Sequence, residues 1–240
     1  MKPVKEGFAE LDVPIYFRVY GSGRKTVVFL HGNGENWQIF RRQIEPIVKE
    51  GYQVLLIDSR GHGHSGFNYR EKLTIEKMAD DVYGVLQYLN IDKAYVVGFS
   101  DGGNIALSLL RRHPECIEKL IVAGANFYPN GMKLSYHLLT VMGWLLMCIM
   151  SVFVAGRRKN RKIMSLMVRQ PRFRSSYFKH IQTPVLVMAG DRDMIKPRHT
   201  LLIKDSFPNS QIAFIKDSDH FIFYRQPDVV NRQIIDFIND

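Results

Sequence analysis

Short apolar runs alternate with amphipathic segments along most of the chain. The apolar runs end near a glycine or a polar residue and cover residues 26–30, 53–57, 93–97, 120–123, 184–189 and 211–215. These runs are apolar at successive positions rather than at every second one, which is typical of strands buried on both faces of a parallel sheet. The pattern therefore predicts six parallel strands at the core of the protein.

Amphipathic segments between these runs predict helices. Their ranges are 37–49, 74–89, 101–112 and 229–238. Thr74 is expected to cap its helix, although Lys77 stands where a complete capping box has Glu or Gln. Alternating strands and helices indicate the α/β class, with a mostly parallel, doubly wound sheet. Residues 7–20 instead predict two strands that turn near 11–14 and form an antiparallel edge.

Residues 126–182 interrupt the alternation. This segment has no strand-like run with its bounding turn residues, and it predicts two or three helices inserted between the fourth and fifth parallel strands. We interpret residues 126–182 as a helical cap on a main domain formed by residues 1–125 and 183–240. A chain of 240 residues suits one large α/β domain of this kind.

An uncharged stretch at 138–155 is followed by a basic cluster at 157–162. Its length reaches the lower limit for a transmembrane helix, which needs about 17–25 apolar residues. Strands of one sheet are predicted on both sides of it, so both ends must lie on the same side of any membrane. Two alternatives remain: a helix that packs on the main domain and walls an apolar pocket, or an exposed apolar face that touches an anionic membrane surface.

The net charge of +10 belongs to the same part of the chain. No Asp or Glu occurs between Lys119 and Gly190, and this stretch holds eleven cations: Lys119, Lys133, Arg157, Arg158, Lys159, Arg161, Lys162, Arg169, Arg172, Arg174 and Lys179. The segment is therefore expected to favour anionic groups that approach it. Bases interleaved with aromatic residues are few elsewhere, which argues against nucleic-acid binding.

The polar N-terminal residues 1–7 are not followed by the apolar run of a signal peptide, so a cytoplasmic location is expected. Cys116 and Cys148 form no disulfide framework and are interpreted as small buried residues. No metal-ligand spacing and no phosphate-binding loop occur, so no metal and no cofactor is expected.

A nucleophile elbow is the strongest chemical signal in the sequence. The segment Gly98-Phe99-Ser100-Asp101-Gly102-Gly103 follows a predicted strand and opens a predicted helix, as the pattern Gly-x-Ser-x-Gly requires. Small residues allow the sharp turn that holds a strained Ser100 above the sheet, and the helix N-terminus points at the site. We therefore predict that Ser100 is a nucleophile; the alternative is a tight turn without catalysis.

A serine hydroxyl needs a base, and His220 is the candidate. It lies between the last predicted strand and the last helix, whereas the other histidines considered precede that position: His31, His62, His64, His113 and His199. The acid that orients His220 should follow the penultimate strand, where Asp191 and Asp193 both occur. Backbone N–H groups of Asp101 and of Asn33, in the loop after the first parallel strand, are the expected oxyanion donors; the alternative for that loop is a plain turn.

These segments resemble the α/β-hydrolase superfamily. The matching motifs are 31–34, 58–65, 98–103, 190–193 and 220–221, in that order. Within the superfamily the chain resembles small capped serine esterases, biphenyl-hydrolase-like enzymes and C–C bond hydrolases. The resemblance implies a Ser-His-Asp catalytic triad, favours Asp193 over Asp191, and makes 1–125 and 183–240 the catalytic domain. It further implies that Arg60 and Ser65 hold a structural loop beside the oxyanion hole.

A serine at the elbow implies an acyl-enzyme on Ser100. We expect a carboxylesterase that acts on small to medium lipophilic esters, with a C–C hydrolase of vinylogous diketones as the alternative and a non-catalytic binding protein as the least favoured. Residues expected to line the substrate pocket are Phe99, Trp144, Met147 and Phe221. The Asp101 side chain either meets a cationic group of the substrate or is an acidic first-turn residue favoured by the helix dipole.

Overall fold

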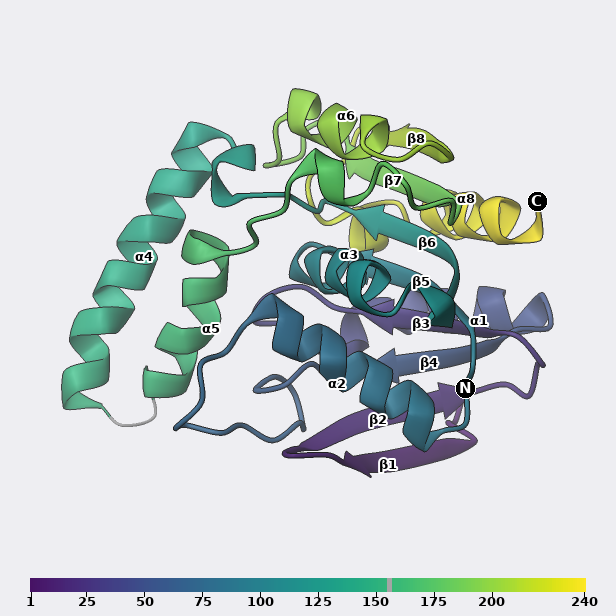
Figure 1. Ribbon diagram of the computed structural model, residues 1–240, viewed down its shortest axis with the longest axis horizontal. Helices are drawn as coiled ribbons and strands as arrows, with labels where there is room; N and C mark the ends of the chain where they lie inside the picture. Colours follow the sequence, from purple (N-terminus) through teal and green to yellow (C-terminus); the bar gives the residue numbers. More distant parts are fainter. Residues whose placement is uncertain (155–156) are drawn as a thin grey trace.

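The computed structural model describes residues 1–154 and 157–240 and contains an eight-stranded sheet, shown in Figure 1. The strands lie in the order β1-β2-β4-β3-β5-β6-β7-β8. Their bounds are β1 Lys5–Glu10, β2 Pro14–Tyr20, β3 Thr26–Leu30, β4 Gln53–Ile57, β5 Ala94–Phe99, β6 Ile117–Ala123, β7 Val185–Gly190 and β8 Ser210–Ile215.

The sheet is parallel apart from its first edge. Strands β3 to β8 pair in parallel, whereas β1 pairs with β2 and β2 with β4 in antiparallel register. Every residue of β3 and β5 is buried, as expected for strands covered on both faces. The predictions of a mostly parallel, doubly wound α/β sheet and of an antiparallel N-terminal edge are both confirmed.

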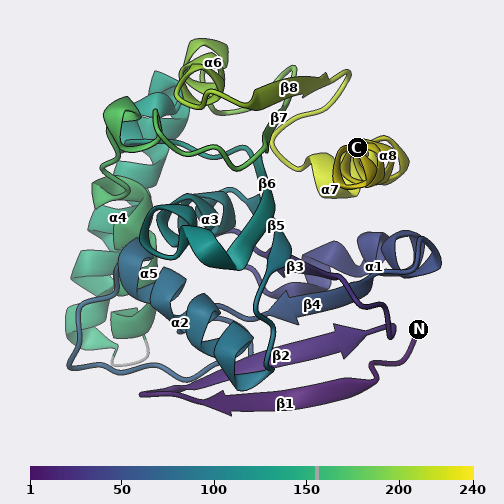
Figure 2. The same ribbon diagram turned by 45° about the vertical axis from the view of Figure 1, so that its right-hand side comes forward.

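Helices cover both faces of the sheet (Figure 2). Their bounds are α1 Arg41–Lys49, α2 Ile75–Tyr88, α3 Asp101–Arg112, α6 Pro197–Asp205, α7 Ile222–Arg225 and α8 Pro227–Asn239, with short 3-10 turns η1 Trp37–Phe40 and η2 Pro114–Cys116. Helices α2, α3 and α6 contribute to one buried core, and α1, α7 and α8 to the other. The predicted cap of α2 is confirmed, because Thr74 Oγ1 accepts a hydrogen bond from the Lys77 N–H at 3.1 Å.

The insertion between β6 and β7 consists mainly of two helices. These are α4, Leu134–Phe153, and α5, Arg157–Arg169, with 3-10 turns η3 Pro129–Gly131 and η4 Ser175–Tyr177. Both helices lie beyond the carboxyl ends of the parallel strands, with α5 between α4 and the rest of the molecule (Figure 1). Ala155 and Gly156, where the uncharged stretch ends, lie outside the described residues. The domain boundaries at 126 and 182 stay a prediction.

Helix α4 is long and apolar, yet most of its surface is exposed. Its 20 residues have a mean hydropathy of 1.8 over the most apolar window, of which 6% is buried. By length and composition it is the one helix among the described residues that could cross a membrane. It packs against α5 and η3 and not against the sheet. Helix α5 lies between α4 and the rest of the molecule, so the main contacts of α4 are with α5. The two alternatives for this helix, a wall of an apolar pocket or a membrane-facing surface, stay predictions.

Candidate active site

Ser100 stands at a strained turn between β5 and α3. Its backbone has φ +54° and ψ −120°, a conformation that residues with side chains rarely adopt. The flanking glycines are needed for space, because a Cβ added at Gly98 would lie 2.3 Å from the Gly102 carbonyl oxygen. A Cβ at Gly102 would lie 2.0 Å from the Leu30 carbonyl oxygen. The local sequence therefore forces the serine into an elbow at the carboxyl end of β5.

A continuous hydrogen-bond path connects Ser100 to a buried carboxylate. The Ser100 Oγ lies 3.0 Å from His220 Nε2, and His220 Nδ1 lies 2.8 Å from Asp193 Oδ1. His220 and Asp193 are both buried, and the Ile195 N–H also donates to Asp193 Oδ1 at 2.8 Å. An acceptor at Nδ1 places the ring proton on that side, which leaves Nε2 free to accept the proton of Ser100.

Three strand ends bring these residues together. Asp193 follows β7, His220 follows β8, and Gly124, with φ +60°, directly follows β6. A Cβ at Gly124 would lie 2.7 Å from His220 Cε1, so this glycine leaves the room that the imidazole occupies. The sequence reasoning missed this role of Gly124; a glycine directly after a buried strand at the carboxyl edge of the sheet is the signal that could have indicated it.

Asp191 has a different function from Asp193. Its two carboxylate oxygens accept hydrogen bonds from the N–H groups of Asp217 and Ser218 at 3.0 and 3.1 Å. These donors lower the pKa of Asp191. The neighbouring Arg192 pairs with Asp217 and not with Asp191. Asp191 therefore joins the loop after β7 to the loop after β8, on which His220 lies.

The loop after β3 lies directly against the nucleophile. A Cβ added at Gly32 would lie 3.1 Å from the Cβ of Ser100. Asn33 Nδ2 donates to Asp101 Oδ2 at 2.8 Å and to the Ile163 carbonyl oxygen of α5 at 2.9 Å. The structure thus brings Asn33 and Asp101 together beside Ser100. The Asn33 side chain, for which the sequence suggested no role, also joins this loop to the insertion.

Two carboxyl groups flank the nucleophile loop, those of the buried Asp101 and of the half-buried Glu35. Asp101 accepts hydrogen bonds from Asn33 and from Asn104, and burial raises its pKa. Glu35 Oε2 accepts from the Gly32 N–H at 3.0 Å, and burial raises the pKa of Glu35 to about 7. Sequence reasoning did not select Glu35, because an acidic residue in the loop after a strand usually faces solvent.

The loop at 58–65 is rigidly held beside the loop after β3. Ser65 Oγ accepts from the Tyr16 N–H at 2.9 Å and donates to the Asp58 carbonyl oxygen. His31 Nε2 accepts from the Ser59 N–H at 2.9 Å, and burial lowers the pKa of His31 to about 4. His31 therefore stays neutral and joins the two loops.

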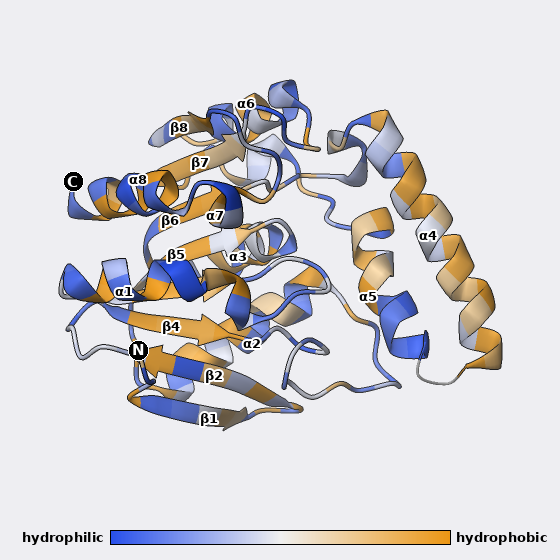
Figure 3. Ribbon diagram, turned by 180° about the vertical axis from the view of Figure 1, so that it is seen from behind, coloured by the Kyte–Doolittle hydropathy of each residue, from blue (hydrophilic) through white to orange (hydrophobic). Residues whose placement is uncertain are grey.

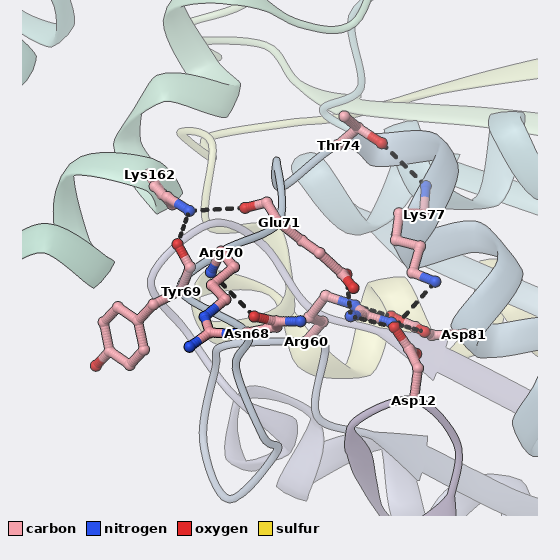
Figure 4. Close-up of polar contacts among 10 residues, drawn as sticks. All are labelled: Asp12, Arg60, Asn68, Tyr69, Arg70, Glu71, Thr74, Lys77, Asp81 and Lys162. Atoms are coloured by element: carbon pink, nitrogen blue, oxygen red, sulfur yellow. Dashed lines mark hydrogen bonds and ion pairs between the residues drawn. The ribbon is translucent and has the colours of Figure 1, made fainter.

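Arg60 connects that loop to the N-terminal strands and to α2 (Figure 4). Its guanidinium, 3% exposed, donates to Asp81 at 2.7 Å and to Asp12 at 2.6 Å. Lys77 Nζ lies 3.0 Å from Asp12, and Glu71 forms a further ion pair with Arg60. Arg60 and Ser65 thus occupy the positions that the resemblance assigns to residues holding this loop.

The residues expected to line the pocket fall into two groups. The rings of Phe99 and Phe221 lie 5.0 and 5.7 Å from the His220 ring centre, beside the triad. Trp144 instead lies under the Arg169 guanidinium at 4.9 Å and lines a cleft of about 890 Å³ between α4, α5 and α2.

The residues around that cleft do not include the triad, so the structure does not bring Trp144 to Ser100. The reason is the packing of the insertion, in which the inner face of α4 meets α5 and not the catalytic loops. Met147 is half-buried on the same helix, and its place in a substrate pocket stays a prediction. No cluster of three metal-ligating side chains occurs in the described part of the chain.

The chain is similar to several known hydrolases in sequence and in structure. A family model described as alpha/beta hydrolase fold matches residues 25–146. The chain is 28% identical to a 2-hydroxy-6-oxononadienedioate/2-hydroxy-6-oxononatrienedioate hydrolase of Dechloromonas aromatica, over 98% of this chain and 93% of that protein.

Two solved structures show the same fold over almost their whole length. The first, Est816, is described as an N-acyl homoserine lactone degrading enzyme; it is 26% identical, with a TM-score of 0.78 over 96% of this chain and 100% of that one. The second, a meta-cleavage product hydrolase of Pseudomonas fluorescens, is 19% identical, with a TM-score of 0.80 over 99% of this chain and 98% of that one.

Proposed function

The chain belongs to the α/β-hydrolase fold family, and from this premise we propose that it is a hydrolase with Ser100 as nucleophile, His220 as base and Asp193 as the acid that orients His220. The observation that supports this proposal is the hydrogen-bond path from Ser100 Oγ through His220 to Asp193. A strained elbow that presents the serine at the carboxyl edge of the sheet is the geometry that nucleophilic catalysis needs.

The arrangement suggests the following sequence of steps. Ser100 Oγ attacks a carbonyl carbon while His220 Nε2 takes the hydroxyl proton, and the ionised Asp193 stabilises the imidazolium. The N–H groups of Asn33 and Asp101, at the loop after β3 and at the start of α3, stabilise the developing oxyanion. His220 then gives the proton to the leaving group, and water, deprotonated by His220, releases the acid from the acyl-enzyme.

The first candidate for the bond that is cleaved is a C–C bond of a vinylogous diketone. Several relatives at 26–28% identity are named for 2-hydroxy-6-oxo dienedioates, which supports this alternative more than the simple ester expected first. A carbon leaving group must depart as a stabilised carbanion, and a conjugated 2-hydroxy-6-oxo system provides that stabilisation. In this proposal Ser100 attacks the 6-oxo carbon and His220 supplies the proton that the carbon leaving group takes up.

An uncharged ester or lactone is the second candidate. Asp101 and Glu35 place two carboxyl groups beside the nucleophile loop, a setting that disfavours the carboxylates of a dianionic substrate when either group is ionised. Est816, at 26% identity, is described as degrading a lactone. A carboxylesterase or lactonase activity on small lipophilic substrates is consistent with both observations.

A direct comparison of substrates tests the proposal. The purified chain is assayed with a 2-hydroxy-6-oxo dienedioate, followed by loss of its conjugated absorbance, with an acyl homoserine lactone, and with p-nitrophenyl esters of increasing chain length. Ser100→Ala is expected to lower kcat by at least about 10³-fold on every accepted substrate. Ser135→Ala, at an exposed serine of α4, is the matched control and should leave kcat unchanged.

The outcomes separate the candidates. A kcat/KM for the dienedioate well above that for the esters supports C–C cleavage, whereas activity on esters or lactones alone supports the second candidate. If no substrate is cleaved and an organophosphonate does not label Ser100, the chain is not a serine hydrolase and the proposal is wrong.

A further inference from the structure

The outer face of α4 is a continuous apolar surface. Nine large apolar side chains of the helix are half to four-fifths exposed: Leu134, Leu138, Leu139, Met142, Leu145, Leu146, Ile149, Val152 and Phe153. Five of them, at 138, 142, 145, 149 and 152, follow the spacing of four and three that places residues on one helical stripe. Figure 3 shows this hydrophobic colouring along the whole of α4. A contiguous apolar surface of this kind marks an interaction site, whereas single exposed residues do not.

This face is not required for packing inside the molecule. The inner face of α4 meets α5 closely at Gly143, where an added Cβ would lie 3.0 Å from Met164 Cε. Trp144 contacts Arg169 of α5 on the same side. The packing of α4 on α5 therefore uses only the inner face of α4. The outer face can be covered only by a partner from outside the chain.

Cations gather directly beside this face. Helix α5 begins with Arg157, Arg158 and Lys159, and the Arg157 N–H donates at 3.0 Å to the carbonyl oxygen of the exposed Val154, the residue after α4. No cation of α5 forms an ion pair with a carboxylate within residues 1–154 and 157–240. The sequence from Lys119 to Gly190 also lacks any Asp or Glu. The surface thus combines apolar area with uncompensated positive charge.

A second copy of the chain fits this surface poorly. A symmetric dimer through α4 would cover the apolar stripe with an identical surface, and the insertion holds no acidic residue that could pair with the basic cluster of the partner copy. An anionic lipid surface can contact both parts of this surface, because its acyl chains pack against the apolar stripe and its phosphate groups pair with the cations. The charge therefore selects lipid over self-association.

The helix lies on such a surface and does not cross it. Twenty residues span about 30 Å, which would suffice for a bilayer core. However, β6 and β7 are adjacent strands of one sheet and enclose the insertion, so the chain must return to the same side. Helix α5, with its 13 residues and basic first turn, cannot make that return through hydrocarbon.

We propose that the outer face of α4, together with Arg157, Arg158 and Lys159, docks the protein on an anionic lipid bilayer. Helix α5 connects this surface to the loop beside Ser100, because the Ile163 carbonyl of α5 accepts a hydrogen bond from Asn33. This inference does not depend on which bond Ser100 cleaves.

Vesicle flotation with the full chain tests the proposal. The probes are vesicles of phosphatidylcholine alone and of phosphatidylcholine with one quarter phosphatidylglycerol, at low and at physiological salt. We expect binding to the anionic vesicles that weakens with salt. The pair Arg157→Gln and Arg158→Gln should lower the partition coefficient roughly 10- to 30-fold, and Val152→Glu should lower it about tenfold or more.

Matched controls use the same chemical changes elsewhere on the surface. Arg41→Gln with Arg42→Gln removes two adjacent exposed arginines at the start of α1, and Val229→Glu changes an exposed valine of α8. Both should leave binding unchanged. Circular dichroism of each variant checks that it is folded.

The proposal is overturned if the wild type does not bind anionic vesicles at low salt. It is also overturned if the controls lose as much binding as the α4 and α5 variants, or if Val152→Glu does not change the partition coefficient. It is also overturned if light scattering shows a dimer that Val152→Glu dissociates. None of these measurements uses substrate turnover, so failure here is distinct from failure of the proposed hydrolase activity.

Discussion

The loops around Ser100 and the helix pair beside them have opposite relations to solvent. In the loops, charged groups such as Asp58, Arg60 and Asp101 are buried and hydrogen bonded. On α4, apolar side chains such as Ile149 and Phe153 are exposed at 61% and 82%. Both arrangements depart from the usual partition of residues between core and surface. The difference indicates that the buried charged groups of the loops serve chemistry within the fold. The exposed apolar side chains of α4 instead serve contact with a partner outside the chain.

The largest effect should follow from a change at Asp193, the residue that we propose orients His220. Asp193→Asn keeps the size of the side chain but can present an amide N–H to His220 Nδ1, which favours the wrong tautomer. We expect kcat to fall by about 10⁴-fold with little change in the melting temperature. Steady-state kinetics on the best substrate measures this effect.

Asp191→Asn is the matched control, because it makes the same chemical change two residues away. Asp191 only joins two loops through the N–H groups of Asp217 and Ser218, and an amide oxygen can still accept one of those hydrogen bonds. Its kcat should stay within about tenfold of wild type. Equal losses in the two variants would show that loop position, and not the His220 tautomer, controls the rate.

The buried ion-pair group of Arg60 should give the next largest effect, on stability. Arg60→Met leaves Asp81, itself 6% exposed, without its cation, and breaking a buried pair in this way costs about 3–5 kcal/mol. Arg192→Met removes a cation from an ion pair whose side chains are 69% and 77% exposed, and should cost less than about 1 kcal/mol. Urea denaturation of both variants gives the two changes in the free energy of unfolding. If the two changes were similar, the buried ion pair would not stabilise the fold more than the exposed one.

Glu35 should make stability depend on pH. The pKa of Glu35 is about 7 in the folded protein and near its ordinary value of 4.5 in the unfolded chain. Between these values the folded protein holds a proton that the unfolded chain has lost, so the free energy of unfolding falls as pH rises from about 4.5 to 7.

Glu35→Gln removes this titration and keeps an acceptor for the Gly32 N–H. The variant should be more stable than wild type above pH 7, by roughly 1–3 kcal/mol, with a smaller difference near pH 5. Denaturation at a series of pH values compares the two proteins. A difference that does not change with pH would mean that Glu35 is not the titrating group.

The sequence predicted the turn around Ser100 because the Gly-x-Ser-x-Gly pattern lies in one short segment. Gly98 leaves space for the Gly102 carbonyl oxygen within that segment, whereas Gly102 leaves space for the Leu30 carbonyl oxygen of the neighbouring strand β3. The choice of Asp193 over Asp191 depended on the family pattern, since both residues lie in the same short loop. Glu35 could not be selected, because its shifted pKa comes from burial by parts of the chain that are distant in sequence.

The strand centres were predicted from their buried apolar runs, and the strand ends less accurately. Strand β6 begins at Ile117 and not at Leu120, and Glu118 at its polar start accepts hydrogen bonds from Lys25, just before β3, and from Tyr95 of β5. The direction in which α4 faces was not predictable, since a helix that is apolar on all sides has no periodic pattern to indicate which face is buried.

The smallest effect should come from the outer face of α4, and it tests the comparison between the two regions most directly. Ile149→Ala shortens a side chain that is 61% exposed and should change the free energy of unfolding by no more than about 0.5 kcal/mol. Ile163→Ala makes the same change at a residue of α5 that is 7% exposed, and should cost about 2–5 kcal/mol because it opens a cavity beside the Asn33 contact. Urea denaturation at two protein concentrations gives both values. A loss of 2 kcal/mol or more in Ile149→Ala would mean that the outer face is buried in solution. If that loss grew with protein concentration, the face would be covered by a second copy of the chain, and the charge argument for a lipid surface would be wrong.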